Sequence, residues 1–335
     1  MPAVIAPAPD TASRLAALRL GILHNPRSGE NLAAAASMRR LFGAYPHIPC
    51  SDVVDPASVT DALRAMAQRG VNAIAVSGGD GTVNAVLNAV LGQELFPRLP
   101  LLAVLRGGTA NMTARDVGMQ GRQDRALRSL LECAAHGGDR LTVTERPVMR
   151  IDPGAGRAPI YGMFFGAAGI AQGIEYFKRN VHTLGLRREI GQAITMARFV
   201  IAMTCGERAI VAPVPITVAI DEAPPSRFDC AILYATTLEQ LVLGLRPFWG
   251  REAAPLHFAS VRASPQYLVK ALPGLLRGRP NRYTTPANGY ESQNAQRLDI
   301  GLDSHFFVDG ERFSPSAGVA LAITDGGPAA FLTVR

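Results

Sequence analysis

Several chemical signatures are missing from this sequence. No Gly-x4-Gly-Lys-Ser/Thr loop occurs and no Gly-x-Gly-x-x-Gly opens a helix, so a Walker A site and a dinucleotide-binding Rossmann fold both lack their fingerprints. Aromatic residues make up only 6% with a single Trp, so side chains for stacking nucleic-acid bases are scarce. The four cysteines, Cys50, Cys133, Cys205 and Cys230, form no Cys-x-x-Cys pair. They indicate neither a zinc ribbon nor a disulfide framework.

Signals for export and membrane insertion are also missing. Residues Met1–Arg14 are rich in Ala and Pro but contain no continuous apolar core, unlike a secretory signal. The longest apolar stretch, Ile190–Cys205, contains Arg198 and is too short for a membrane span. We therefore expect a cytoplasmic protein whose only membrane contact is peripheral, at the inner face.

The composition that is present describes a large, basic, globular protein. A length of 335 residues with 48% hydrophobic residues is enough for two domains and a substantial core. Lys and Arg number 34 against 27 Asp and Glu, which gives a net charge of +7. This balance favours anionic partners such as nucleotides or an anionic membrane surface. With so few aromatics, we do not expect nucleic acid as a partner.

The first third of the chain alternates predicted strands and helices, which indicates an α/β domain with a parallel sheet. The predicted strands are 18–23, 51–54, 71–77 and 101–105, and the predicted helices are 31–42, 59–69, 82–91, a helix from about 109, and 122–135. Ligands of such sheets lie beyond the carboxyl ends of the strands. Three glycine turns follow strands here, so we expect them to converge at one crevice.

The second part reads as an antiparallel β-sandwich, because short apolar strands are separated by turn residues and mostly lack helices between them. A helical insertion is expected at about 173–203. The predicted division is an extended or disordered N-terminus at 1–16, an α/β nucleotide-binding domain at 17–138 and a β-sandwich domain at 139–318. Residues 319–335 form C-terminal strands that could return to the first domain.

The most informative segment runs from Val76 to Asn88. An apolar strand leads into Gly78-Gly79-Asp80-Gly81, and a helix opens at Thr82. Glycines let backbone N–H groups approach a ligand closely, and a helix N-terminus adds unpaired N–H groups with a partial positive charge. This combination is typical of a phosphate site. Asp80 would repel a bare polyphosphate, so the loop favours a nucleotide with its metal.

Three further segments occur in order around this loop: Asn25-Pro26-Arg27-Ser28-Gly29 before it, then Gly107-Gly108-Thr109-Ala110-Asn111, and near the end Asp309-Gly310-Glu311. The ordered set resembles the bacterial type of the diacylglycerol kinase and sphingosine/ceramide kinase family. The resemblance covers roughly residues 18–334. It implies an α/β nucleotide domain and a β-sandwich lipid domain, with ATP and Mg²⁺ between them, and phosphoryl transfer to a lipid at an anionic membrane surface.

The resemblance also implies site residues. Asp309 and Glu311 match the acidic pair that holds the general base, and Asp80 lies at the centre of the triphosphate loop as a catalytic residue and metal ligand. The implied nucleotide contacts are Asn25, Pro26, Arg27, Ser28, Gly29, Gly78, Gly79, Asp80, Gly81, Thr82, Asn84, Gly108, Thr109 and Asn111.

Some positions depart from the family pattern. Ala85 stands where Glu is common, and Met112 follows Asn111 where Asp is common. The stretch 248–256 offers only Glu252 for the accessory Mg²⁺ site that many bacterial members have, so we expect that site to be absent.

Each motif alone also has a structural interpretation. Asn25–Gly29 has the composition of an ordinary turn, and Asp309-Gly310 between apolar and polar strand residues is typical of a hairpin turn. Two other functions stay open. An NAD kinase shares the Gly-Gly-Asp-Gly-Thr loop, and a non-catalytic lipid-binding regulator could keep the same fold. The sequence leaves the oligomeric state open, with a homodimer as one option.

Two basic segments suit an anionic lipid surface. Residues Tyr267–Tyr283 mix leucines with Lys270, Arg277, Arg279 and Arg282, and a second cluster contains Lys178, Arg179, Arg187 and Arg188. Basic side chains among leucines are typical of segments that lie on anionic membranes. A solvated basic face over a few core leucines explains the same pattern equally well.

Overall fold

The computed structural model divides the chain into two compact units, and it describes residues 15, 17–135, 140–176, 188–205, 207 and 211–335. Unit 1 takes in the residues up to Arg146 together with Pro328–Arg335, and unit 2 is Pro147–Gly327. The division therefore falls at Arg146, compared with the expected boundary at 138, and the last eight residues belong to unit 1.

Unit 1 is built on a parallel sheet with strand order β2-β1-β3-β4. Its strands are β1 (Leu20–His24), β2 (Cys50–Asp52), β3 (Ala73–Gly78) and β4 (Leu101–Arg106), and the end of β15 (Leu321–Val334) adds to β4 in parallel. β1 and β3 are buried along their whole length. Burial on both faces explains why these strands read as continuous apolar runs.

Helices cover both faces of this sheet. They are α2 (Gly29–Ala44), α3 (Pro56–Gln68), α4 (Asp80–Gly92), α5 (Met112–Asp116) and α6 (Gln123–Ala135). Leu20 and Ile22 of β1 share a core with residues of α2 and α6. The intervening Gly21 faces the other way, toward Met66 of α3. Because alternate residues of a strand point to opposite faces, α2 and α6 cover one face and α3 covers the other.

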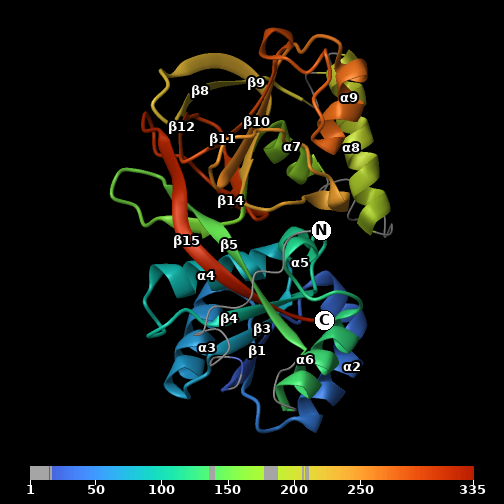
Figure 1. Ribbon diagram of the computed structural model, residues 1–335, viewed down its shortest axis with the longest axis vertical. Helices are drawn as coiled ribbons and strands as arrows, with labels where there is room; N and C mark the ends of the chain where they lie inside the picture. The colour runs from blue at the N-terminus through green and yellow to red at the C-terminus, as the bar shows by residue number, and fades with distance from the viewer. Residues whose placement is uncertain (1–14, 16, 136–139, 177–187, 206, 208–210) are drawn as a thin grey trace. The chain divides into compact units, whose positions relative to one another are not determined.

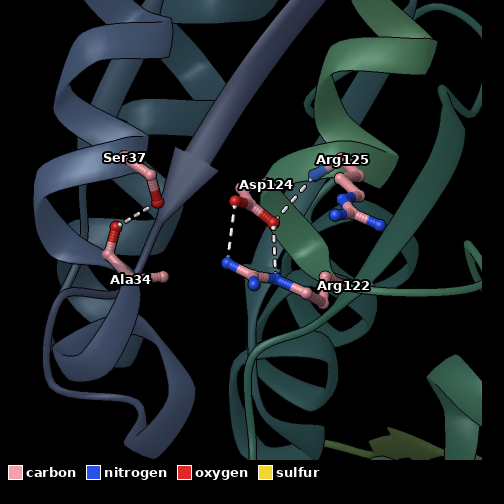
Figure 2. Close-up of polar contacts among 5 residues, drawn as sticks. All are labelled: Ala34, Ser37, Arg122, Asp124 and Arg125. Carbon is pink, nitrogen blue, oxygen red and sulfur yellow. Dashed lines mark hydrogen bonds and ion pairs between the residues drawn. The ribbon is translucent and has the colours of Figure 1, made fainter.

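Two of these helices have clear start signals. Asp55 caps α3, because its carboxylate accepts a hydrogen bond from the Ser58 N–H while the Ser58 hydroxyl accepts one from the Asp55 N–H. In the first turn of α6, Asp124 accepts hydrogen bonds from the Arg125 N–H and from the Arg122 guanidinium (Figure 2). An acidic side chain at this place also complements the positive end of the helix dipole.

Unit 2 is mainly antiparallel sheet. Its strands are β6 (Ile160–Gly162), β7 (Phe164–Ala168), β8 (Val214–Ile220), β9 (Ser226–Thr236), β10 (Leu256–Arg262), β11 (Tyr290–Ala295), β12 (Arg297–Gly301), β13 (Phe306–Val308) and β14 (Glu311–Phe313). β9 connects the sheet: its first half pairs with β8, and its second half pairs with both β7 and β10. Inward side chains from most of these strands form one core.

Helices line part of unit 2. They are α7 (Gly169–Tyr176), α8 (Arg188–Cys205) and α9 (Leu268–Arg277), with short 3₁₀ turns at Val242–Gly244 and Pro286–Asn288. α7 and α8 account for the described parts of the expected helical insertion. The predicted basic residues Lys178, Arg179 and Arg187 lie outside the described residues.

Together these elements confirm the predicted fold class, an α/β domain with a parallel sheet followed by an antiparallel β region. Two strands differ from expectation. Short strands at 142–144 and 148–151 were expected, but residues 141–152 form a single strand, β5 (Leu141–Asp152). Likewise, β15 runs unbroken from Leu321 to Val334, where strands at 319–323 and 330–334 were expected. Among the described residues, no helix combines the length and the apolar character that crossing a bilayer requires.

Candidate nucleotide site and acidic hairpin

The first loop, Asn25–Gly29, is bonded to the second, Gly78–Asn84. The Asn25 N–H donates to the Ser77 carbonyl at 2.8 Å, and the Asn25 side-chain amide donates to the Thr82 hydroxyl at 3.0 Å. The Ser28 hydroxyl accepts a hydrogen bond from the Gly79 N–H at 3.2 Å. Both loops follow adjacent parallel strands, β1 and β3, so their carboxyl ends meet at one edge of the sheet.

The second and third loops approach so closely that only glycine fits. A Cβ on Gly108 would lie 2.3 Å from the Gly79 Cα, and one on Gly107 would lie 2.9 Å from the Gly78 backbone. The Gly107 N–H donates to the Gly78 carbonyl at 3.0 Å, and the Gly107 carbonyl accepts from the Glu30 N–H at 3.1 Å. All three predicted nucleotide loops therefore converge within unit 1.

Asp80 is buried at this junction and connects two helices. It is the first residue of α4, which begins two residues before the predicted Thr82. Its carboxylate accepts hydrogen bonds from the Met112 and Thr113 N–H groups, each at 3.2 Å, and so caps the N-terminus of α5. Burial raises the pKa of Asp80, while the hydrogen bonds from these N–H groups act in the opposite direction.

The cap that Asp80 supplies explains the local form of the third loop. Asn111, the residue before α5, has a left-handed backbone with φ 50° and does not cap the helix with its own side chain. Its side-chain amide instead closes the loop on Gly108, accepting from the Gly108 N–H at 2.7 Å and donating to the Gly108 carbonyl at 2.9 Å. Asn111 therefore holds the glycine turn against the second loop.

The other predicted nucleotide residues differ in exposure. The Arg27 side chain is exposed on the first loop, beside Pro26 and Gly29. Thr82 and Asn84 are buried in the first two turns of α4, and Asn84 accepts a hydrogen bond from Asn88 one turn later. Thr109 is half-buried in the third loop. Gly81 lies in the first turn of α4, where a backbone N–H has no partner within the helix.

A buried polar network lies directly beneath the loops and was not predicted. The Asn31 amide donates to the Asn25 carbonyl at 2.6 Å and to the Ser77 carbonyl at 2.9 Å. The side-chain oxygen of Asn31 accepts a hydrogen bond from the Gln123 side-chain amide, and the Ser77 hydroxyl lies 3.0 Å from the His24 Nδ1. Burial lowers the pKa of His24, against the opposing effect of Asp52. Polar residues at the ends of two apolar strands, His24 and Ser77, were the available signal.

The acidic pair lies in unit 2, on the hairpin between β13 and β14. Asp309 and Gly310 have φ of 49° and 87° and form a two-residue turn, the conformation that Asp-Gly favours between paired strands. Asp309 is only 2% exposed. Its carboxylate accepts from the Phe164 N–H at 2.9 Å and from the Met163 N–H at 3.0 Å. Glu311 is exposed.

Possible metal ligands are sparse. Within the described parts of the chain, no group of three or more His, Cys, Asp and Glu side chains is placed to hold a metal ion. Each carboxylate oxygen of Asp80 accepts one N–H bond, from Met112 or from Thr113, so the N-terminus of α5 holds this carboxylate in place. The Glu252 carboxylate accepts from the Asn294 N–H at 2.8 Å.

The family model of the diacylglycerol kinase catalytic domain matches residues 19–143, the segment that contains all three converging loops. Residues 19–143 are therefore similar to a diacylglycerol kinase catalytic domain. The matched segment includes the capped α5 and the buried network, and it ends just before the division between the units. The search of curated proteins gives no match.

Solved structures extend the fold similarity beyond residues 19–143. A diacylglycerol kinase from Bacillus anthracis is 14% identical with a TM-score of 0.59, over 95% of this chain and 96% of its own. Two further B. anthracis structures, named as candidate diacylglycerol kinases, have TM-scores of 0.62 and 0.60 at 16% and 15% identity. Both matches cover 95% of this chain. They cover 96% of the first of these structures and 97% of the second. At such identities the likeness establishes the shared fold.

Proposed function

We propose that this protein is an ATP-dependent lipid kinase that transfers the γ-phosphate of ATP to a hydroxyl of diacylglycerol, ceramide or a sphingoid base. One observation carries the proposal: the glycine loops meet so closely, with Gly108 against Gly79, that only residues without a side chain fit. They meet inside a segment that matches the diacylglycerol kinase catalytic domain. A close approach of this kind leaves backbone N–H groups accessible to phosphate oxygens.

The polyphosphate would bind at the N-terminus of α4. There the Gly81 N–H has no partner within the helix, and the helix dipole favours negative charge. Arg27, exposed on the first loop, adds a guanidinium suited to phosphate oxygens. The Gly79 N–H would exchange its bond to the Ser28 hydroxyl for a phosphate oxygen. These contacts take the place of the lysine of a Walker A loop.

Phosphoryl transfer forms a bond between the lipid oxygen and the γ-phosphorus and breaks the bond between that phosphorus and the bridging oxygen of ADP. The lipid hydroxyl must also lose its proton, and a carboxylate within reach would accept it. Asp309 and Glu311 are the candidates. The Asp309 carboxylate is held by two backbone N–H groups, whereas the Glu311 side chain is exposed.

Phosphoryl transfer by kinases uses Mg²⁺ to neutralise charge on the phosphates. Because the Asp80 carboxylate caps α5, we assign Asp80 a positioning role between the second and third loops. A cytoplasmic location, with the protein at the inner membrane face, follows from the proposed lipid substrate.

The test is a labelling experiment. Purified protein is incubated with ATP labelled on the γ-phosphate, Mg²⁺ and, separately, diacylglycerol, ceramide, sphingosine and NAD. Label in a lipid supports the proposal. Label in NAD alone would replace it with an NAD kinase, and lipid binding without label would indicate a non-catalytic regulator.

A further inference from the structure

We propose that one face of α9, with the segment that follows it, docks this protein onto an anionic lipid bilayer. The α9 surface is defined by Tyr267, Val269, Lys270, Arg277 and Arg282. The proposal rests on the proposed lipid-kinase function for its biological purpose, but its evidence comes from unit 2 alone.

The inner side of α9 packs in the core of unit 2. Leu268, Ala271 and Leu275 pack in one buried cluster with Tyr290. This packing holds the helix in place even though Pro273 lies inside it. Because the core packing holds the helix in place, the side chains on its opposite side face away from the core of unit 2.

The outer side of α9 combines apolar and basic residues. Val269 is 64% exposed and the preceding Tyr267 is 52% exposed. Pro273, four residues after Val269, and Lys270 and Arg277, seven residues apart, are also exposed on successive turns. Exposed apolar residues beside cations on one helix face are typical of helices that lie in a membrane interface.

Cations and tyrosines are gathered at one end of this surface. The Lys270 ammonium lies 5.8 Å from the centre of the Tyr267 ring and 5.4 Å from that of Tyr283. The Arg282 guanidinium lies 4.8 Å from the Tyr283 ring, and it donates to the Tyr283 hydroxyl at 2.6 Å. Tyrosine, lysine and arginine are the side chains that favour the level of the lipid headgroups.

Charge selects an anionic bilayer as the partner. Residues 267–283 contain four basic side chains, Lys270, Arg277, Arg279 and Arg282, and no acidic one. The neighbouring α8 adds exposed Ile194 and Ile201, seven residues apart on one face, and its Met203 packs against the α9 core (Figure 1). Cations alone would suit any polyanion, but exposed valine, tyrosine and isoleucine side chains gain more from acyl chains than from a nucleic acid.

Vesicle sedimentation tests the proposal. Phosphatidylcholine vesicles with and without phosphatidylserine are mixed with the full chain, with a Lys270→Glu/Arg282→Glu variant and with Val269→Asp. We expect the native protein to sediment with the anionic vesicles. Removing two cations near the surface should weaken this binding about 30-fold or more, and Val269→Asp should weaken it by a smaller factor. Melting temperatures confirm that the variants fold.

The matched control is Arg39→Glu/Arg40→Glu, which makes the same change of net charge on exposed positions of α2 in unit 1. We expect this variant to keep most of the vesicle binding. Equal losses in both double variants would show that only net charge matters and would overturn the proposal, as would a native protein that stays in the supernatant.

A second readout separates docking from catalysis. Label transfer to a short-chain, water-soluble diacylglycerol requires no bilayer, so the α9 variants should retain it. If the native protein sedimented with the anionic vesicles but transferred no label, the docking proposal would be supported and the proposed kinase activity would be overturned. Label transfer by a native protein that does not sediment would support the kinase and overturn the docking proposal.

Discussion

The glycine loops of unit 1 and the acidic hairpin of unit 2 carry short motifs of the same kind, but they relate to the fold differently. In the loops, backbone atoms of separate segments approach until no Cβ fits, as at Gly108 and Gly79. A turn alone does not require such an approach. In the hairpin, Asp309 and Gly310 occupy the turn that their types favour, and the Asp309 carboxylate bonds to β7. The fold by itself already explains that motif.

A motif therefore indicates a ligand most strongly where the local turn or helix does not by itself require the residue types that the motif contains. Gly107 and Gly108 meet that condition. Asp309 meets it only if its carboxylate has a chemical role in addition to holding Met163 and Phe164.

Asp309→Asn should nearly abolish label transfer to lipid while leaving ATP binding close to normal, if Asp309 accepts the lipid proton. It should also lower the free energy of unfolding by about 1–3 kcal/mol, because an NH₂ group replaces the carboxylate oxygen that accepts from the Met163 N–H and then faces that donor. Labelling assays and denaturant titrations measure the two effects separately.

Glu311→Gln is the matched control for stability, because the Glu311 side chain is exposed. We expect its unfolding free energy to stay within about 0.5 kcal/mol of the native value. Full labelling by Asp309→Asn would remove Asp309 from the mechanism, and loss of labelling in Glu311→Gln alone would transfer the role of base to Glu311.

Gly108→Ala should weaken ATP binding roughly tenfold or more. The new Cβ would lie 2.3 Å from the Gly79 Cα, and forcing the two backbones apart costs about 1–3 kcal/mol. Isothermal titration with ATP measures the change. Gly43→Ala on α2 is the control, since no heavy atom lies within 4 Å of its added Cβ. If Gly108→Ala bound ATP with native affinity, the close approach of Gly108 to Gly79 would not be needed for nucleotide binding.

Asn31→Ala should lower the unfolding free energy by about 1–3 kcal/mol, because the Asn25 and Ser77 carbonyls lose a buried donor. ATP binding should weaken as well, since the first loop loses its support. Ser37→Ala on the same helix removes only a half-buried bond to the Ala34 carbonyl (Figure 2). Thermal melts of the two variants should differ clearly, and equal melting temperatures would contradict a supporting role for Asn31.

His24 should make stability depend on pH. Because its folded-state pKa is lowered by burial, the unfolded chain binds more protons than the folded one as pH falls below about 6.5. Its contribution is therefore complete above that value and is lost as the pH falls toward the folded-state pKa. His24→Gln should flatten the loss of stability between about pH 7 and pH 5. An unchanged slope would show that other groups cause it.

Much of unit 1 could be predicted from sequence because each strand is a short apolar run that ends in a glycine or polar turn. Unit 2 was harder. β5 contains Glu145-Arg146-Pro147, and β15 contains Asp325-Gly326-Gly327-Pro328, so hydrophobic periodicity breaks in the middle of each strand. In α9 the helical pattern is interrupted by Pro273, and the buried leucines Leu268 and Leu275 hold the helix through tertiary packing.

The candidate site was predictable only in part. Loop residues such as Gly79 and Asn25 stand in recognisable short motifs. The supporting network of His24, Asn31, Ser77 and Gln123 is spread over four elements and forms only in three dimensions. The sequence placed Asp80 beside phosphate and metal, and it gave no sign that this carboxylate would cap α5.

Backbone hydrogen exchange on addition of ATP tests the central claim most directly. If the three loops together hold the polyphosphate, exchange should slow in peptides covering 25–31, 78–84 and 107–113 at the same ATP concentration, while peptides on distant helices such as α3 stay unchanged. Unchanged exchange in all three segments at saturating ATP, or protection confined to other parts of the chain, would contradict the account.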